Sequence, residues 1–290
     1  MSDEPSPSRR DREAAPPRLF DRPLRRRRAA RTAAAFPAHD VLHAYAAELA
    51  AEKLMDVARP FARALVWGDR GRHLEARLPQ GKIAQLVHAG PDEDAEASPW
   101  LGGDFDLVVS LLDLHAANDP VGALVQAGAA LKPDGLFLGV MFGAETLNEL
   151  RAALADAEIE AGGLSPRVFP FADVRDAGAL LQRAGFALPV ADADRLTIRY
   201  GDPLRLLADL RGAGETNVLT ARRRSFLARG TLMRALALYA ERHGGADGRV
   251  PATFAFVTLT GWRPHESQPQ PLKPGSARMR LEDALKSRPS

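Results

Sequence analysis

The stretch FDLVVSLLDLHAANDPVGALVQAGAALKPDGLFLGVMF, residues 105–142, decides the fold of this chain. Its apolar runs FDLVVSLL (105–112) and LFLGVMF (136–142) are nearly continuous, as in strands that are covered on both faces of a parallel sheet. Between them the pattern predicts a helix over about 120–131, which ends at the turn Lys132-Pro133-Asp134-Gly135. A strand, a crossover helix and a second strand indicate a parallel sheet wound with helices.

Upstream, the runs ARALVWG (62–68) and GKIAQLVHA (81–89) are predicted strands of the same sheet, because each is a short apolar segment. Before them, apolar residues at spacings of three and four predict a helix that Asp40 can cap and that ends at Arg59-Pro60. The first half of the chain is therefore expected to be an α/β unit.

Downstream, helices are predicted over 146–159 and 173–184, and strands over RLTIRY (195–200) and TFAFVTLTGW (253–262). The segment between these two strands has a helical pattern, which includes a helix over 220–242. Three apolar residues of that helix are predicted to share a buried face: Phe226, Met233 and Leu236.

Composition excludes several classes of protein. The chain has 290 residues, no cysteine and a net charge of +2, so a disulfide framework, a thiolate nucleophile and a Cys-ligated metal are excluded. No apolar run approaches the roughly 20 residues that span a bilayer, and the first residues have no apolar signal-peptide core. We therefore expect a cytoplasmic protein.

Two local patterns are given their plainer interpretation. The basic run Arg25–Arg28 lacks interleaved aromatic residues, so we expect a solvated helix start and no nucleic-acid site. His39 and His43 have a spacing that suits a metal, but no third ligand is near, so we expect a surface pair and no metal.

The loop after the first strand reads Val66-Trp67-Gly68-Asp69-Arg70-Gly71-Arg72. Glycines at this place let a backbone approach a dinucleotide or S-adenosylmethionine, and a carboxylate at the end of the second strand binds the ribose. Here the second strand ends at His88 without an acid; Asp92, Glu93 and Asp94 come a few residues late. The loop alone is a weak cofactor signal.

Several longer segments are more specific. They are Phe20-Asp21-Arg22, the stretches 105–124, 131–151 and 162–186, Gly214-Glu215-Thr216-Asn217, VPATF (250–254) and GWRPHESQ (261–268). In these segments the chain resembles the methyltransferase-like complex I assembly factor family, whose studied member is a protein-arginine hydroxylase. That family belongs to the class I S-adenosylmethionine-dependent methyltransferases and is related to malonyl-carrier-protein methyltransferase. The resemblance covers about residues 18–277. Because the family is found in mitochondria and in alphaproteobacteria, we expect this chain to be a bacterial, cytoplasmic member.

The resemblance implies a Rossmann-like α/β sheet with helices on both faces. We expect it to be shortened around its third strand, because few residues separate His88 from Phe105, and to carry a helical insertion before its last strand. The predicted organisation is a disordered tail over 1–18, a methyltransferase-like domain over 19–265 with the insertion at about 202–243, and an irregular tail over 266–290.

The resemblance also supplies candidate site residues. The cofactor-side candidates are Gly68, Asp69, Gly71, His88, Leu112 and His115. The substrate-side candidates are Asp21, Arg22, Met141, Phe142, Asn217 and His265. No catalytic residue is assigned. Met141 and Phe142 are equally compatible with strand-end core. For Trp67 we expect packing rather than adenine stacking, and for Asn118-Asp119 a helix cap rather than ligand contact.

The first loop departs from the family pattern L-D-L-G-C-G-R-G, because Val66 replaces the acid and Asp69-Arg70 replace Cys-Gly. An Arg70 side chain is expected to occupy volume near the methionine moiety, and a lost charge-assisted ribose bond costs about 1.5–3 kcal/mol. Our first hypothesis is an assembly factor that binds or acts on a complex I subunit with weakened or lost S-adenosylmethionine binding.

The alternative is an active S-adenosylmethionine-dependent methyltransferase or protein-arginine hydroxylase, and a third possibility is another small-molecule role on the same fold. If the enzyme hypothesis holds, Gly68→Arg is expected to abolish activity and leave the fold intact. The sequence leaves the oligomeric state open.

Overall fold

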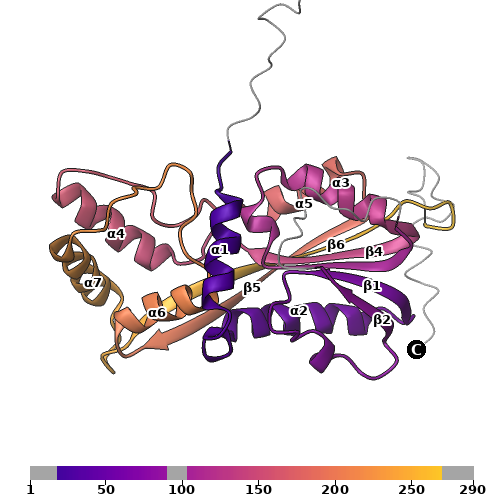
Figure 1. The fold of residues 1–290 in the computed structure, drawn as a ribbon, viewed down its shortest axis with the longest axis horizontal. Coiled ribbons are helices and arrows are strands. Elements are labelled where there is room, and N and C mark those ends of the chain that lie inside the picture. The colour runs from indigo at the N-terminus through magenta and orange to yellow at the C-terminus, as the bar shows by residue number, and fades with distance from the viewer. Residues whose placement is uncertain (1–17, 90–102, 270–290) are drawn as a thin grey trace, which may run out of the picture.

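The computed structural model describes residues 18–89 and 103–269, and within these ranges six strands form one mixed sheet. Their order is β2-β1-β3-β4-β6-β5, with β1 to β4 parallel and β6 antiparallel to both of its neighbours (Figure 1). The sheet therefore confirms the predicted mixed α/β architecture. The bounds are β1 Phe61–Trp67, β2 Ile83–His88, β3 Phe105–Leu111, β4 Leu131–Phe142, β5 Ala187–Tyr200 and β6 Val250–Trp262.

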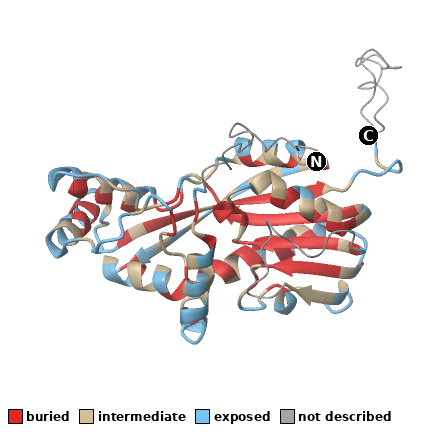
Figure 2. Cartoon of the chain, turned by 45° about the horizontal axis from the view of Figure 1, so that its top comes forward, coloured by how far each residue is buried: buried red, intermediate tan, exposed pale blue. Residues whose placement is uncertain are grey.

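Helices cover both faces of the sheet, which explains the continuous apolar runs of the central strands. Helix α2 (Val41–Asp56) lies on one face, and α3 (Pro120–Ala130) and α5 (Val174–Arg183) lie on the other. Because strand side chains alternate, Val109 packs with the α2 side and Val108 with the α3 side. Figure 2 shows the buried strands between these layers.

Local sequence sets the start of α3. Asp119 accepts a hydrogen bond from the backbone N–H of Gly122 at 2.8 Å, and Pro120 occupies the first turn of the helix. The predicted Asp119 cap is confirmed. Asn118 has a different role, because its side chain bonds both backbone groups of Phe20.

The remaining helices lie around the part of β5 and β6 that extends past the other strands (Figure 1). Helix α1 crosses this region in front of the sheet, and α4 packs on α7. Their bounds are α1 Arg22–Thr32, α4 Asn148–Glu160, α6 Pro203–Ala213 and α7 Arg229–His243. Helices α6 and α7 lie between β5 and β6 in the chain.

The predicted helix over 220–242 starts late and buries fewer of its apolar residues than expected. Helix α7 begins at Arg229. Phe226 lies before it and is fully exposed, Met233 is 52% exposed, and only Leu236 is buried. The physical reason lies in the sequence before the helix, because the adjacent Arg222–Arg224 cannot share a buried apolar face with Phe226.

The strands differ from their predicted bounds by length. Strand β4 begins at Leu131, five residues before the predicted start, and β5 begins at Ala187 rather than at residue 195. The extra part of β5 begins with the apolar residues 187–191, but Pro189 disfavours a strand there and the side chains are only half-buried or exposed.

The prediction that His39 and His43 form a surface pair is also wrong. His43 is only 3% exposed beneath α1, whereas His39 is half-buried. None of the helices in the described ranges is long and apolar enough to cross a membrane. The predicted tails fall mostly on residues 1–17 and 270–290, and the late acids Asp92, Glu93 and Asp94 on 90–102; these lie outside the described residues.

Candidate functional site

A cavity of about 530 Å³ opens at the carboxyl ends of β1, β2 and β3, beneath α1. We call it the cofactor-side pocket, because ligands of open α/β sheets bind at this edge. Four predicted cofactor-side residues line it, together with the predicted substrate-side residue Arg22. They are Gly68, Asp69, His88 and Leu112.

Gly68 holds the first loop against β3. Its φ is +78°, and a Cβ atom there would lie 1.9 Å from the backbone oxygen of Leu111. A side chain at this position therefore displaces the backbone itself. The expectation that Gly68→Arg leaves the fold intact is wrong.

The other two loop candidates have local contacts. The Asp69 carboxylate accepts hydrogen bonds from the backbone N–H groups of His73 (2.9 Å) and Leu74 (3.1 Å), so it closes the loop. Gly71 is exposed and does not line the pocket. His88 ends β2 with a buried Nε2 that has no hydrogen-bond partner among the described residues.

Arg70 joins three segments at the rim of the cofactor-side pocket. Its guanidinium donates to the carbonyl oxygens of Ala213 and Ala29, the latter at 3.0 Å, and lies 4.3 Å from the centre of the Phe36 ring. Burial lowers its pKa from the ordinary value, although the carboxylate of Glu215 opposes this effect. Arg70 thus occupies the pocket rim as part of the scaffold.

Two acidic residues inside the pocket are paired with arginines of α1. Asp113 contacts Arg22 at 3.1 Å and also forms an ion pair with Arg25. Arg25 reaches Glu215 at 3.4 Å and donates to the backbone oxygen of Leu112. Burial alone raises the pKa of Asp113, but the two guanidinium groups outweigh burial and hold that pKa below its usual value.

Glu215 also lies between two histidines. Its carboxylate is 3.7 Å from Nε2 of His43 and 3.4 Å from Nε2 of His115. Burial lowers the pKa of His43 to about 3 and also lowers that of His115. Burial raises the pKa of Glu215, but Arg25 and His115 outweigh it, so Glu215 stays ionised. The site therefore holds a buried carboxylate beside two neutral imidazoles.

Sequence reasoning named His115 but missed Asp113, Glu215, His43 and Arg25 as members of this cluster. Glu215 lies within the segment Gly214-Glu215-Thr216-Asn217, and that segment was the available signal. Within the described ranges no group of three His, Asp or Glu side chains is arranged to hold a metal ion.

A second cavity, of about 350 Å³, adjoins this cluster, and we call it the apolar pocket. Glu215 lines both cavities. Phe142 lines the apolar pocket, and its ring lies 4.9 Å from that of His115. Met141 instead packs in the core under α3 and α5 and lines neither of these two cavities. The wall of the apolar pocket is mainly Leu147, Leu150, Phe169, Phe171, Leu207, Leu210 and Leu227.

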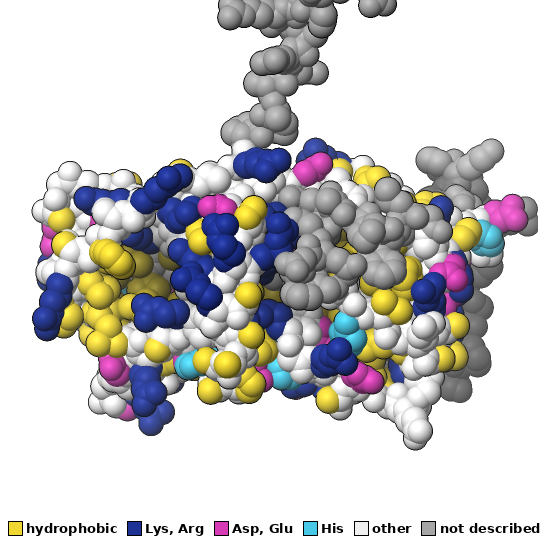
Figure 3. Space-filling view, viewed as in Figure 1, with side chains coloured by type: hydrophobic (Ala, Val, Ile, Leu, Met, Phe, Trp, Pro, Cys, Tyr) yellow, Lys and Arg dark blue, Asp and Glu magenta, His cyan; other side chains and the backbone are white. Residues whose placement is uncertain are grey.

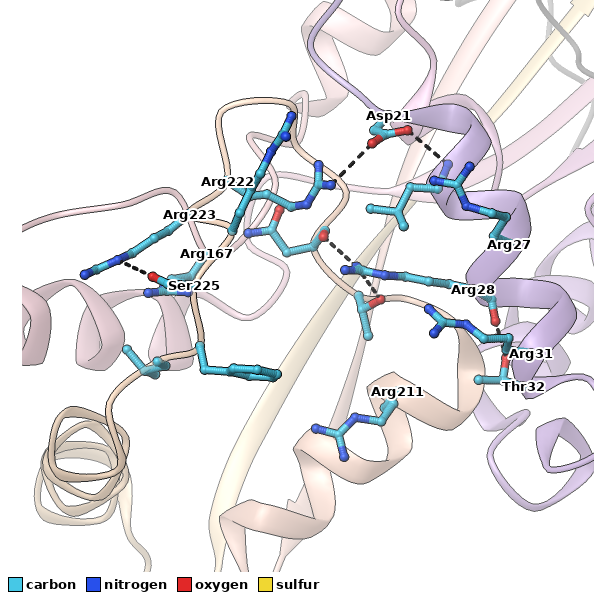
Figure 4. Close-up of a pocket in the computed structure, with 16 residues that line it drawn as sticks. Asp21, Arg27, Arg28, Arg31, Thr32, Arg167, Arg211, Arg222, Arg223 and Ser225 are labelled. Atoms are coloured by element: carbon cyan, nitrogen blue, oxygen red, sulfur yellow. Dashed lines mark hydrogen bonds and ion pairs between the residues drawn. The ribbon is translucent and has the colours of Figure 1, made fainter.

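A third and larger cavity of about 1010 Å³ lies beside α1 and is rich in arginine (Figures 3 and 4). We call it the arginine groove. Asp21 lies at one end, where it accepts a bond from the backbone N–H of Leu24 and contacts Arg222 at 3.3 Å. Asn217 donates to the carbonyl oxygen of Pro166 at 2.7 Å. Its arginines are Arg27, Arg28, Arg31, Arg167, Arg211, Arg222, Arg223 and Arg224.

His265 is the candidate that the structure separates from the others. It follows β6, whose last residue Trp262 pairs with Leu136 near the start of β4. His265 therefore lies at the amino ends of the parallel strands, opposite to the end where the pockets open. Its ring contacts Ser267 at 2.7 Å. The antiparallel direction of β6 carries His265 away from the other substrate-side candidates.

The acidic side chains that line the cofactor-side pocket all have partners. Both acids of the pocket interior, Asp113 and Glu215, contact arginines, and Asp69 binds backbone N–H groups. Among the described residues that line this cavity, no carboxylate is without such a partner. The cationic residues that line the same cavity are Arg22, Arg25, Arg26, Arg70 and Arg72.

The sheet order, with one reversed strand between β4 and β5, and a pocket at the carboxyl ends of β1 and β2 define the class I methyltransferase fold. No family model matches the chain. It is 36% identical over 289 residues to the mitochondrial arginine-hydroxylase NDUFAF5 of Danio rerio, an alignment that covers 92% of this chain and 90% of that protein. The chain therefore belongs to the NDUFAF5 arginine-hydroxylase family.

Two further comparisons give more distant similarities. The malonyl-[acyl-carrier protein] O-methyltransferase of Laribacter hongkongensis is 34% identical over 193 residues, 66% of this chain and 63% of that protein. Among solved structures, the YcgJ protein of Bacillus subtilis aligns over 76% of this chain and 99% of its own, with a TM-score of 0.46 and 12% identity.

Proposed function

We propose that this protein is an assembly factor that binds or acts on a subunit of respiratory complex I, and that its binding of S-adenosylmethionine is weakened or lost. Family membership supports the biological role. One observation supports the loss of cofactor binding: arginines of α1 contact both interior acids of the cofactor-side pocket, Asp113 and Glu215.

Electrostatics supports this proposal in a second way. The cofactor carries a sulfonium cation, and guanidinium groups that line the same cavity disfavour a further positive charge. Loss of one charge-assisted bond to the ribose costs about 1.5–3 kcal/mol, which weakens binding by roughly tenfold to a hundredfold.

The alternative is an active methyltransferase or protein-arginine hydroxylase. It is favoured by the preserved cavity at the expected sheet edge and by the unpartnered Nε2 of His88, which is placed to bond a polar ligand. In that case Glu215 is the group suited to hold a substrate guanidinium, because it is an ionised carboxylate shared by the cofactor-side and apolar pockets.

Titration of the full chain with S-adenosylmethionine, and separately with S-adenosylhomocysteine, tests the proposal by calorimetry. We expect no heat at micromolar ligand from protein that is shown to be folded. Micromolar binding would instead favour the enzyme.

A cellular assay completes the test. Cells that lack the gene receive wild type, Ala30→Trp or Ala34→Trp, and complex I activity is measured. Ala30 is exposed and lines the cofactor-side pocket, whereas the nearby exposed Ala34 does not. Both variants are expected to restore complex I. Loss with Ala30→Trp alone would mean that the pocket must receive a ligand.

A further inference from the structure

The arginine groove gathers eight guanidinium groups from α1, from α6 and from the segments that follow α4 and α6 in the chain (Figure 4). Among the described residues only two of the eight have an ion-pair partner: Arg167 with Glu158, and Arg222 with Asp21. The side chains of Arg27, Arg31 and Arg224 make no hydrogen bond or ion pair with another described residue. The groove therefore carries a large excess of unneutralised positive charge.

The excess positive charge of the groove also affects the arginines within it. Burial lowers the pKa of Arg28, and the neighbouring Arg222 and Arg31 lower it further, with only Asp21 opposing them. Like charges that converge on one concave surface repel each other, and their field attracts an anion. In Figure 3 several dark-blue Lys and Arg side chains gather around the position of α1, next to an area of hydrophobic side chains.

The arginine groove is continuous with the apolar pocket. The two cavities share Arg167, Arg211, Thr216, Asn217 and Leu227. The apolar pocket has the volume and the leucine and phenylalanine lining that an apolar side chain requires. Phe226, which is fully exposed, stands on the wall of the groove.

We propose that the arginine groove binds an acidic peptide segment of a protein partner, and that one apolar side chain of that segment enters the apolar pocket. This proposal rests on the proposed function only in taking the partner to be a protein. A peptide suits the site because carboxylates pair with guanidinium groups and an apolar side chain needs no hydrogen bonds in its pocket.

A single-stranded nucleic acid suits the site less well. Sequence-tolerant strand binding uses several aromatic side chains on which successive bases stack. Phe226 is the only aromatic residue that lines the described groove. The wall of the apolar pocket beyond it is mainly leucine and phenylalanine, which cannot hydrogen-bond a base edge.

The test measures fluorescence anisotropy of a labelled peptide that contains six glutamates and one central leucine, with the full-length protein and without cofactor. The groove variant is Arg27→Gln/Arg31→Gln/Arg224→Gln. The matched control is Arg175→Gln/Arg183→Gln/Arg205→Gln, which removes three exposed arginines outside the groove. Circular dichroism and thermal unfolding establish that both variants are folded.

We expect micromolar binding by wild type and by the control, and at least tenfold weaker binding by the groove variant. Replacement of the peptide leucine by serine is expected to weaken binding at least fivefold. Equal weakening by both variants, or no binding by wild type, overturns the proposal. Tighter binding of an oligonucleotide of equal charge, sensitive to the same groove variant, also overturns it in favour of nucleic acid.

The cellular assay of complex I distinguishes a failure of the groove proposal from a failure of the proposed function. If wild type fails to restore complex I but binds the peptide through the groove, the assembly role is wrong and the groove proposal stands. If wild type restores complex I and the peptide does not bind, the groove proposal alone is wrong.

Discussion

Arg25 and Asp113 form an ion pair that fastens helix α1 to the loop after β3. The same guanidinium reaches Glu215 and the backbone oxygen of Leu112, so one side chain connects three segments that are far apart in the sequence. The helix that covers the cofactor-side pocket is thus held by two of the acids that line that pocket. The stability of the protein and the state of its pocket are coupled through this contact.

Arg25→Ala is expected to lower the free energy of unfolding by about 3 kcal/mol, because it leaves two buried carboxylates with fewer partners. Urea unfolding followed by circular dichroism measures the change. Arg27→Ala is the control, because Arg27 is exposed on the same helix and has no ion-pair partner among the described residues; its effect is expected to stay within about 0.5 kcal/mol. Equal effects of the two substitutions would contradict the structural role of Arg25.

Acid is expected to destabilise the protein well before its surface carboxylates titrate. The pKa of His43 is about 3 in the folded protein and about 6.5 in the unfolded chain. Below pH 6.5 the unfolded chain therefore binds a proton that the folded protein excludes, so stability falls as the pH falls. From His43 alone the loss at pH 5 is about 2 kcal/mol.

The pKa shifts of the other groups in the cluster also make the protein less stable as the pH falls. The lowered pKa of His115 adds to the loss below pH 6.5, and the lowered pKa values of Asp113 and Glu215 remove further stability below about pH 4.5. Unfolding curves from pH 7 to 5 measure the slope. His43→Gln is expected to flatten it and His39→Gln to preserve it; the reverse result would refute the assignment to His43.

Gly68→Ala is expected to destabilise the fold by more than about 4 kcal/mol, because the new methyl group meets the backbone oxygen of Leu111. Gly81→Ala is a matched control. Gly81 has a φ of +85°, but a Cβ atom there would meet no atom within 4 Å, so only the cost of about 1–2 kcal/mol for a left-handed conformation applies. Thermal unfolding compares the two, and similar losses would mean that backbone conformation alone explains the effect.

The stretch 105–142 predicted the central sheet because its strands are buried on both faces, and burial of this kind leaves a clear apolar run. The start of β5 is half-buried and contains Pro189, so its short apolar run did not indicate a strand. The loop glycines and His88 were named as site candidates only because they follow the first strand and end the second strand. The pairing of Arg22 and Arg25 with Asp113 spans about ninety residues, and no local pattern encodes it.

Phe226 and His265 show two further limits. Helical spacing placed Phe226 on a buried face, but burial depends on which charged neighbours must reach solvent. His265 was grouped with the substrate-side residues. Only the antiparallel direction of β6 reveals that it lies at the opposite end of the strands from the pockets. Direction and register are tertiary properties, which a single sequence does not give.

The described N-terminal segment is fastened by a two-point contact that offers a direct test. Asn118 accepts a hydrogen bond from the backbone N–H of Phe20 at 2.8 Å and donates one to its carbonyl oxygen at 3.1 Å. Next to it, the N–H of Asp21 donates to the oxygen of Val218 at 2.8 Å. Together these bonds fix the start of α1 over the pockets.

Asn118→Ala removes both side-chain bonds and leaves the buried backbone groups of Phe20 without them, which costs about 1–3 kcal/mol. We expect the start of α1 to open locally more often, so that trypsin cleaves within Arg25–Arg28 at least fivefold faster under native conditions. Mass spectrometry identifies the cleaved bond. Asp119→Ala, which removes the cap of α3, is the control and is expected to leave this cleavage rate unchanged. If both variants accelerate it equally, the contact of Asn118 with Phe20 does not specifically hold α1 in place.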